Sequence, residues 1–366
     1  MKRHATATPL ERPATDLPAR ILRNPDAFRA YTTRRVPRAA LTATCRDIAT
    51  PAAGDLVLAR VEALGHHKRL HLPNGRRRQL FAGDEIIVAY ADRYAPQQFE
   101  ARVPPDLGPC HLVASGGVAG RVETRHRRIR SGPTRIRPIG LVCSEPGEPP
   151  LNVANWALPP APHPEPGRVP IIAALGTSMD SGKTTSVADL AHGATSAGYR
   201  VGYAKVTGTG AAGDPMLMVD AGADPVLDFT DVGHVSTYLL SDDVVESILL
   251  ELIGHLQHAR VDVILLEVAD GLLQRETAAL ASGPLFRRFV DGCLFAAPDA
   301  MSAVAGVAWL RDRRLPGLGL CGSIETSPLQ VREASEATAL PHFGRSDLAD
   351  PATAAKLISL AATRGS

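Results

Sequence analysis

The sequence predicts an α/β protein in which a doubly wound, mostly parallel sheet follows a smaller, β-rich and barrel-like domain. Two patterns lead to this prediction. From residue 169 onward, short apolar runs alternate with segments of helical periodicity, as in βαβ units. Before that, short strand-like runs follow one another closely and are separated by Asn-Gly and Gly-Asp turns, as in small antiparallel barrels.

Four segments follow from these patterns. We expect a largely extended arm over residues 1–40, the β-rich domain over 41–145, a Pro-rich linker over 146–168 and the α/β domain over 169–366. Nine prolines lie between Pro146 and Pro170, too many for a helix or a central strand. The linker therefore marks the domain boundary.

The individual elements come from local periodicity. In the β-rich domain the expected strands are 55–61, 69–72, 78–81, 84–90, 98–103, 117–122 and 136–142. In the α/β domain the expected strands are 171–175, 200–206, 261–267, 292–296 and 317–321. Helices are expected after the first of these strands, from Ser241 to Leu256 and from Pro351 to Ala361.

The first strand of the α/β domain runs into a Gly-bounded polar loop that ends in Gly-Lys-Thr-Thr. The loop has the spacing G-x5-G-K-T, one residue longer than the usual phosphate-binding pattern. A strand, such a loop and a helix start aim backbone N–H groups at one point, where phosphate binds. The expected phosphate-binding residues are Gly176, Thr177, Ser178, Met179, Asp180, Ser181, Gly182, Lys183, Thr184 and Thr185. Only five residues are lysine among 40 Lys plus Arg, and one of them is Lys183.

Two further strand ends should meet this loop at the same edge of the sheet. The second strand ends at Lys205 and is followed by a Gly-rich loop up to Asp214, and the third ends at Glu267. We expect Lys183, Lys205 and Glu267 to be catalytic, and Thr184, Asp214 and Glu267 to hold Mg²⁺. A lysine at the end of a buried strand needs an anionic partner, which we expect to be the γ-phosphate or the acceptor substrate.

The loop from Gly176 to Thr184 resembles that of dethiobiotin synthetase and its relatives, which share the extra residue. The segments Lys205–Gly208 and Glu267–Gly271 are similar to the lysine-containing turn and the strand-three Glu motif of that family, and Asp214 matches a metal-binding Asp by position. The resemblance covers about residues 169–345. It implies a P-loop NTPase fold with ATP and Mg²⁺, but it does not imply the biotin precursor as the substrate.

Composition limits the other possibilities. The content of 45% hydrophobic and 21% charged residues is that of a globular protein, and no apolar stretch has the length of a signal peptide or a membrane span. We therefore expect a cytoplasmic protein without a membrane partner. Five scattered cysteines without a C-x-x-C pair predict neither disulfides nor a zinc site, and His66, His67 and His71 are interpreted as a surface loop rather than a metal site.

Charge is divided unevenly between the halves. Residues 1–168 carry a net charge of +11 and residues 169–366 a net charge of −9. Attraction between the halves or a polyanionic partner of the first half would each explain this division. The basic run between Arg121 and Arg137 lacks interleaved aromatic residues, so nucleic acid is not the expected partner.

These observations favour an enzyme that passes the γ-phosphoryl group of Mg²⁺-ATP to a small carboxylate- or carbamate-type acceptor, as a ligase or a kinase-like enzyme does. We expect it to be a homodimer. The alternative is a nucleotide-driven switch whose basic N-terminal domain binds a protein or a nucleic acid.

Overall fold

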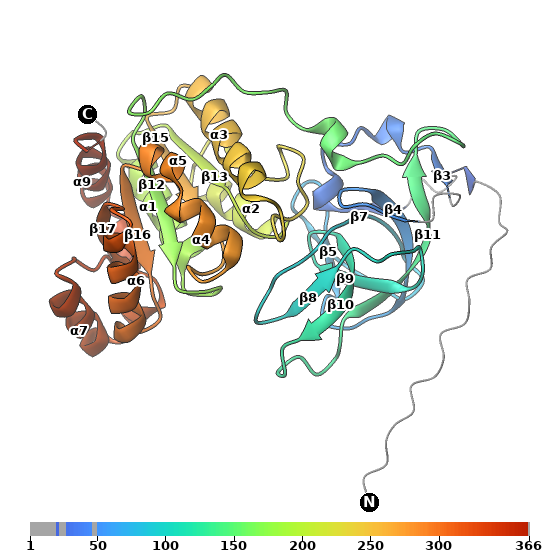
Figure 1. Ribbon diagram of the computed structural model, residues 1–366, viewed down its shortest axis with the longest axis horizontal. Helices are drawn as coiled ribbons and strands as arrows, with labels where there is room; N and C mark the ends of the chain where they lie inside the picture. The colour runs from blue at the N-terminus through green and yellow to red at the C-terminus, as the bar shows by residue number, and fades with distance from the viewer. Residues whose placement is uncertain (1–19, 22–26, 46–49, 365–366) are drawn as a thin grey trace, which may run out of the picture.

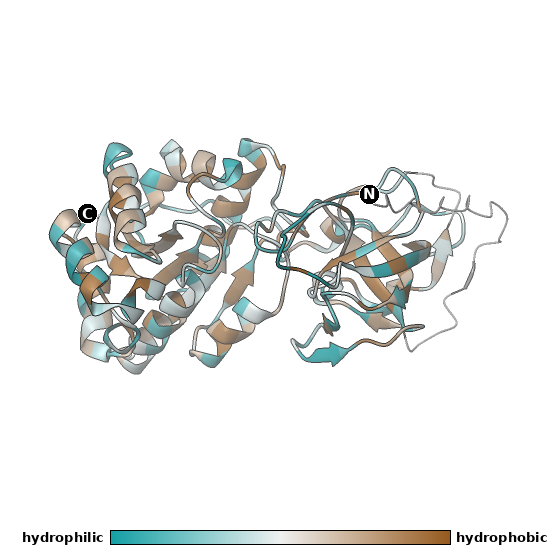
Figure 2. Cartoon of the chain, turned by 90° about the horizontal axis from the view of Figure 1, so that it is seen from below, coloured by the Kyte–Doolittle hydropathy of each residue, from teal (hydrophilic) through white to brown (hydrophobic). Residues whose placement is uncertain are grey.

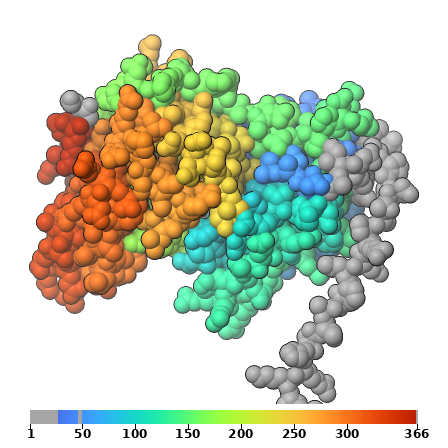
Figure 3. Space-filling view, viewed as in Figure 1, coloured from blue at the N-terminus to red at the C-terminus, as the bar shows by residue number. Residues whose placement is uncertain are grey.

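The structure of the protein is a computed structural model, which describes residues 20–21, 27–45 and 50–364. A β-rich region and a larger α/β region lie side by side (Figure 1). In the space-filling view the two regions touch along a broad front (Figure 3). The predicted fold class is confirmed: a six-stranded parallel α/β sheet follows a β-rich region.

The β-rich region closes into a small barrel. Its ring consists of β4 (Leu56–Ala63), β7 (Glu85–Tyr90), β10 (Val118–Arg125), β9 (Cys110–Ala114) and β11 (Thr134–Cys143), and β11 pairs with β4 again. Alternate residues, among them Val57, Ile86, Leu112 and Ile136, fill the interior. Outside the ring lie β1 (Arg20–Ile21), β2 (Phe28–Arg29), β3 (Ala43–Cys45), β8 (Phe99–Arg102) and the hairpin of β5 (Arg69–His71) and β6 (Arg77–Gln79).

The barrel departs from the expected antiparallel pattern. Strand β10 runs parallel to β7, and so does β2. Strands β8 and β9 both run antiparallel to β10, so the chain keeps its direction from β8 to β9. Because of this missing reversal, β10 runs in the same direction as β7. Strand β9 was not expected at all, because its residues follow a Pro- and Gly-containing segment without clear alternation.

The α/β region contains one sheet with the strand order β14-β13-β15-β12-β16-β17. These strands are β12 (Ile171–Gly176), β13 (Val201–Lys205), β14 (Val226–Asp228), β15 (Val263–Glu267), β16 (Gly292–Ala296) and β17 (Gly317–Cys321). Every neighbouring pair is parallel. Strand β12 lies in the middle of the sheet, so the loop that follows it opens between two neighbouring strand ends.

Helices cover both faces of this sheet, whose apolar strands lie between them (Figure 2). One face packs against α1 (Lys183–Ser196), α2 (Gly213–Asp220), α8 (Arg345–Ala349) and α9 (Pro351–Ala362). The other packs against α3 (Asp242–His258), α4 (Arg275–Ser282), α5 (Pro284–Phe289), α6 (Ala300–Asp312) and α7 (Pro328–Thr338). No helix among the described residues is long and apolar enough to cross a membrane.

Part of the expected arm is packed between the two regions. Residues 1–19 and 22–26 lie outside the described part of the chain, but η1 (Tyr31–Thr33) is buried and η2 (Arg38–Ala40) follows it. The Tyr31 hydroxyl donates to Asp228 at 2.9 Å. Residues 31–35 are therefore part of the contact between the regions, and this stretch of the chain is not an extended arm.

Ion pairs cross this contact. Arg34 lies 2.7 Å from Asp231 and 3.5 Å from Asp228, and Arg35 lies 3.5 Å from Asp231. The basic side chains come from the first half and the acidic ones from the second. These pairs are an attraction between the halves, one of the two explanations that the charge division left open.

The Pro-rich segment is held against the α/β region. It contains η3 (Val153–Trp156), and beyond it Ala161 N–H donates to Glu251 at 2.8 Å and Glu165 N–H donates to Gln257 at 2.9 Å. Both acceptors lie on α3. The connection passes over one end of the α/β region (Figure 1). The two hydrogen bonds to α3 hold it in place there.

Candidate functional site

The predicted phosphate loop lies between β12 and α1. Gly182 is the N-cap of α1 and has a φ of 99°, a value that favours glycine. A Cβ atom there would lie 2.7 Å from the Cα atom of Gly322. Because the N-cap has no side chain, the first N–H groups of α1 have no side-chain cap and can bind an anion.

Lys183 is buried next to this loop, with 5% of its surface exposed. Its Nζ atom donates to the carbonyl oxygens of Ser178 at 2.8 Å and Asp270 at 2.7 Å. An ammonium group has three donors, so one remains for a ligand. Burial lowers the pKa of Lys183, as expected for a cation whose hydrogen-bond acceptors are neutral.

Glu267 lies at the end of β15 with only 2% of its side chain exposed. Its Oε1 atom accepts a hydrogen bond from Thr184 Oγ1 at 2.9 Å, and its Oε2 atom accepts one from the Tyr203 hydroxyl at 3.0 Å. The structure thus brings together Thr184 and Glu267, two of the three predicted metal ligands. Tyr203 was not predicted, because an aromatic residue inside a strand is normally part of the core.

Lys205 lies between the predicted acidic ligands. Its Nζ atom donates to Asp214 and, at 3.1 Å, to Glu267. Burial alone would lower the pKa of Lys205, but the two carboxylates raise it, and Lys205 in turn lowers the pKa of Asp214 against the effect of burial. The sequence suggested a phosphate or acceptor as the anion beside Lys205. In the structure that place is taken by two carboxylates of the chain itself, since the ends of β13 and β15 and the start of α2 meet there.

The donor set fits a nucleotide with Mg²⁺. The uncapped start of α1 and Lys183 offer N–H donors to phosphates, while Thr184, Asp214 and Glu267 offer oxygen atoms. No group of three or more His, Cys, Asp or Glu that could hold a metal occurs in the described part of the chain. Magnesium usually binds one or two carboxylates together with phosphate oxygens and water, so two acidic residues and a hydroxyl suit it.

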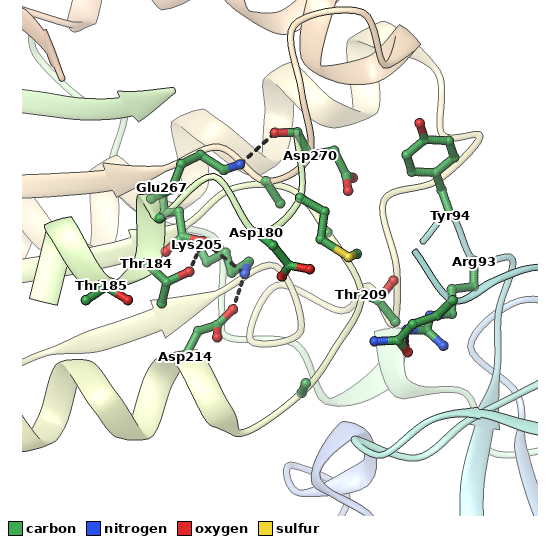
Figure 4. A pocket seen from close by; sticks show the side chains of 17 residues that line it. Arg93, Tyr94, Asp180, Thr184, Thr185, Lys205, Thr209, Asp214, Glu267 and Asp270 are labelled. Atoms are coloured by element: carbon green, nitrogen blue, oxygen red, sulfur yellow. Dashed lines mark hydrogen bonds and ion pairs between the residues drawn. The ribbon is translucent and has the colours of Figure 1, made fainter. Parts of the chain in front are cut away.

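A cavity of about 510 Å³ opens at this edge of the sheet (Figure 4). From the phosphate loop and α1 it is lined by Met179, Asp180, Gly182, Lys183, Thr184 and Thr185. Lys205, Asp214 and Glu267 also line it. Gly176, Thr177, Ser178 and Ser181 do not line it, and within the described residues the buried hydroxyls of Thr177 and Ser181 have no hydrogen-bond partner.

The opposite wall of the cavity comes from the barrel. Arg93, Tyr94 and Gln98 line it. Arg93 and Tyr94 lie across from Lys205 and Asp214 (Figure 4). Sequence reasoning missed all three, because they belong to the segment between β7 and β8 and no local pattern relates them to the phosphate loop. The barrel therefore contributes directly to the candidate site.

Two histidines near this wall are buried, contrary to the surface-loop interpretation. His67 has 7% of its surface exposed and its Nε2 atom lies 3.1 Å from an Arg93 nitrogen. His71 Nδ1 accepts a hydrogen bond from the Ala212 N–H at 3.1 Å, across the contact between the regions. His71 thus joins the barrel to the α/β region, and His67 supports an arginine of the barrel wall.

Asp270 adds a titratable group to the same cavity. It has a φ of 65° and follows β15 by three residues. Burial raises the pKa of Asp270 to about 6, against the opposing charges of Lys183, Lys205 and Arg93. A carboxyl group with such a pKa can exchange a proton near neutral pH.

Solved structures of known proteins are similar to about half of this chain. No protein-family model and no curated protein matches the sequence. The signal recognition particle receptor FtsY from Elizabethkingia anophelis is 16% identical with a TM-score of 0.37, over 54% of this chain and 68% of that one. FtsY from Mycoplasma mycoides is 18% identical with a TM-score of 0.35, over 54% and 68%. The signal recognition particle 54 kDa protein from Aeropyrum pernix, in complex with GDP, is 17% identical with a TM-score of 0.36, over 53% of this chain and 48% of that one.

At identities of 16–18% and TM-scores of 0.35–0.37, these structures assign no role to any residue of this chain. The α/β region has the arrangement of a P-loop nucleotide-binding fold, with a strand, a phosphate loop and a helix at the centre of a parallel sheet. The finer resemblance to dethiobiotin synthetase stays a prediction.

Proposed function

We propose that the protein is a Mg²⁺-nucleotide-dependent enzyme that uses the γ-phosphoryl group to activate a small carboxylate- or carbamate-type acceptor. The observation that supports this proposal is the cavity of about 510 Å³, which has the phosphate loop on one side and polar barrel residues on the other. Such a cavity leaves room for an acceptor beside the terminal phosphate.

Each site residue has a role in this proposal. The start of α1 and Lys183 bind phosphate oxygens, and Thr184, Asp214 and Glu267 hold Mg²⁺. The bound Mg²⁺-nucleotide supplies the transferable phosphoryl group. Lys205 fixes the positions of Asp214 and Glu267, which makes it a positioning residue in addition to a source of positive charge.

A nucleotide-driven switch is the second candidate. The loop after β13 reaches the barrel, where a Cβ atom on Gly116 would lie 1.9 Å from the Gly210 carbonyl oxygen. A nucleotide-dependent movement of this loop would therefore act on the barrel of the same chain. We rank this function second because residues of both regions line one cavity beside the phosphate loop, which favours an acceptor site there.

The test begins with nucleotide binding. ATP and GTP are titrated with Mg²⁺ into the wild-type protein, the Lys183→Ala variant and the control Lys356→Ala, whose lysine is exposed on α9. We expect Lys183→Ala to lose about ten- to a hundredfold in nucleotide affinity or more, because charge-assisted hydrogen bonds to phosphate are lost. Wild-type affinity in a folded Lys183→Ala protein would remove the central claim.

The second step separates an enzyme from a switch. Phosphate release is measured with the nucleotide alone and with pools of small carboxylates, carbamates and amines. An enzyme should release phosphate faster with one of the pools, whereas a switch should show the same slow rate with all of them. The pool that accelerates release then identifies the class of acceptor.

A further inference from the structure

The barrel wall of the cavity holds a buried arginine with neutral hydrogen-bond partners. Arg93 has 5% of its surface exposed, and its terminal nitrogens contact His67 Nε2 at 3.1 Å and Gln98 Oε1 at 2.7 Å. The Nε atom of Arg93 is buried and has no partner in the described part of the chain. Among the described residues, Arg93 forms no ion pair with a carboxylate.

His67 does not neutralise this charge. Burial, reinforced by the Arg93 charge, lowers the pKa of His67 to about 2, so its ring is neutral and its Nε2 atom can accept the hydrogen bond from Arg93. The other ring nitrogen lies 3.2 Å from Ser115 Oγ. Both partners of the guanidinium are thus uncharged groups that orient it.

The backbone also fixes Arg93. Its N–H donates to the Ala101 carbonyl at 2.9 Å, and its carbonyl accepts from the Ala101 N–H at 3.0 Å. A guanidinium group has five N–H donors, of which two are used, so three remain. The free donors belong to a residue that lines the cavity shared with Lys183 and Glu267 (Figure 4).

A buried cation without an anionic partner is costly. Burial lowers the pKa of Arg93 to about 9, and the charge of Asp270 acts in the opposite direction. The cation is retained at a wall of the cavity, where an anionic ligand would compensate it. Planar guanidinium donors match the paired oxygens of a carboxylate or a phosphate.

We propose that Arg93 binds a substrate oxyanion in the cavity, either the terminal phosphate of the nucleotide or the carboxylate of the acceptor. This inference rests on the proposed function and extends it, because it makes the barrel part of the substrate site. The His67 and Gln98 side chains are positioning residues that hold the guanidinium group toward the ligand.

The first arm of the experiment tests the terminal phosphate. Affinities for Mg²⁺-ADP and for a non-hydrolysable Mg²⁺-ATP analogue are measured in the wild-type protein, in Arg93→Met and Arg93→Lys, and in the control Arg121→Gln, an exposed arginine of β10. If Arg93 binds the terminal phosphate, Arg93→Met should lose about ten- to a hundredfold in affinity for the triphosphate and keep its affinity for the diphosphate.

The second arm tests the acceptor carboxylate. With Mg²⁺-ADP at saturation, a panel of small carboxylates is titrated, each beside its neutral amide, for example succinate beside succinamide. If Arg93 binds the acceptor, Arg93→Met should lose about ten- to a hundredfold in affinity for the carboxylate and bind the amide as the wild type does. Arg93→Lys keeps the charge without the paired donors, so a smaller loss is expected on the same ligand.

Wild-type affinity of a folded Arg93→Met protein for both kinds of ligand would overturn the inference. Should Arg93→Met not fold, Arg93→Lys supplies the same comparison, and unchanged affinities there would count against the paired contact. Both arms measure equilibrium binding and need no turnover. Failure of the proposed function, seen as the lack of acceptor-dependent phosphate release by the wild type, is therefore distinguishable from failure of this inference.

Discussion

The two walls of the cavity compensate their charges in different ways. On the α/β wall, Lys205 is paired with Asp214 and Glu267 inside the chain itself. On the barrel wall, Arg93 has two neutral partners and free donors. The first arrangement stabilises the fold of the strand ends and leaves no charge on Lys205 for a ligand to compensate. The second leaves a positive charge that an anionic ligand can compensate. We therefore expect an anionic ligand to interact more strongly with Arg93 than with Lys205.

The largest expected effect concerns the paired wall. Lys205→Ala leaves Glu267 as a buried carboxylate without its cation, which should lower the free energy of unfolding by about 3–5 kcal/mol. Denaturant unfolding checks this, with Arg93→Met as the comparison from the other wall, where a smaller change is expected because no carboxylate is left unpaired.

A double variant sharpens the same prediction. Adding Glu267→Gln to Lys205→Ala removes the unpaired charge and should recover part of the lost stability, as a coupled pair requires. Equal unfolding midpoints for the wild type and Lys205→Ala would show that the ion pairs of Lys205 do not stabilise the α/β wall.

The contact between the walls is the next target. A Cβ atom at Gly116 would lie 1.9 Å from the Gly210 carbonyl oxygen, so Gly116→Ala must push the barrel away from the loop after β13. We expect a loss of roughly 2–3 kcal/mol in stability and weaker nucleotide turnover. The matched control is Gly213→Ala at the same contact, where the nearest atom would be 3.6 Å away. An equal response of both variants would argue against a tight contact.

The smallest expected effect is a pH dependence that arises on the barrel wall. The pKa of His67 is lowered to about 2 in the folded protein, mainly by burial, so the unfolded chain binds a proton at higher pH than the folded one. The stability that His67 contributes is present above about pH 6.5 and decreases as the pH falls below it. Between pH 7.5 and pH 5 this should cost about 2 kcal/mol.

Unfolding of His67→Gln and of the exposed control His192→Gln at both pH values checks this prediction. His67→Gln should lose most of the pH dependence that this residue causes, whereas His192→Gln should keep the wild-type slope. A slope in His67→Gln equal to that of the wild type would assign the pH dependence to other groups.

The sequence by itself determined the elements whose signal is local. The strands at 292–296 and 317–321, the closing helix from Pro351 and the phosphate loop with Lys183 appear where periodicity and spacing predicted them. The meeting of Thr184 with Glu267 was also predictable, because parallel strands end at one edge of a sheet.

Only the tertiary structure decided what faces that edge. Arg93 and His67 come from a region more than eighty residues away in the chain, and nothing in their own neighbourhood points to a phosphate loop. Lys205 and Asp214 form an internal ion pair because α2 turns back onto β13, which no local pattern indicates. Local periodicity reflects which side of a strand or helix is apolar. The partner of a buried charge depends instead on how separate elements pack together, and this is settled only when the whole chain folds.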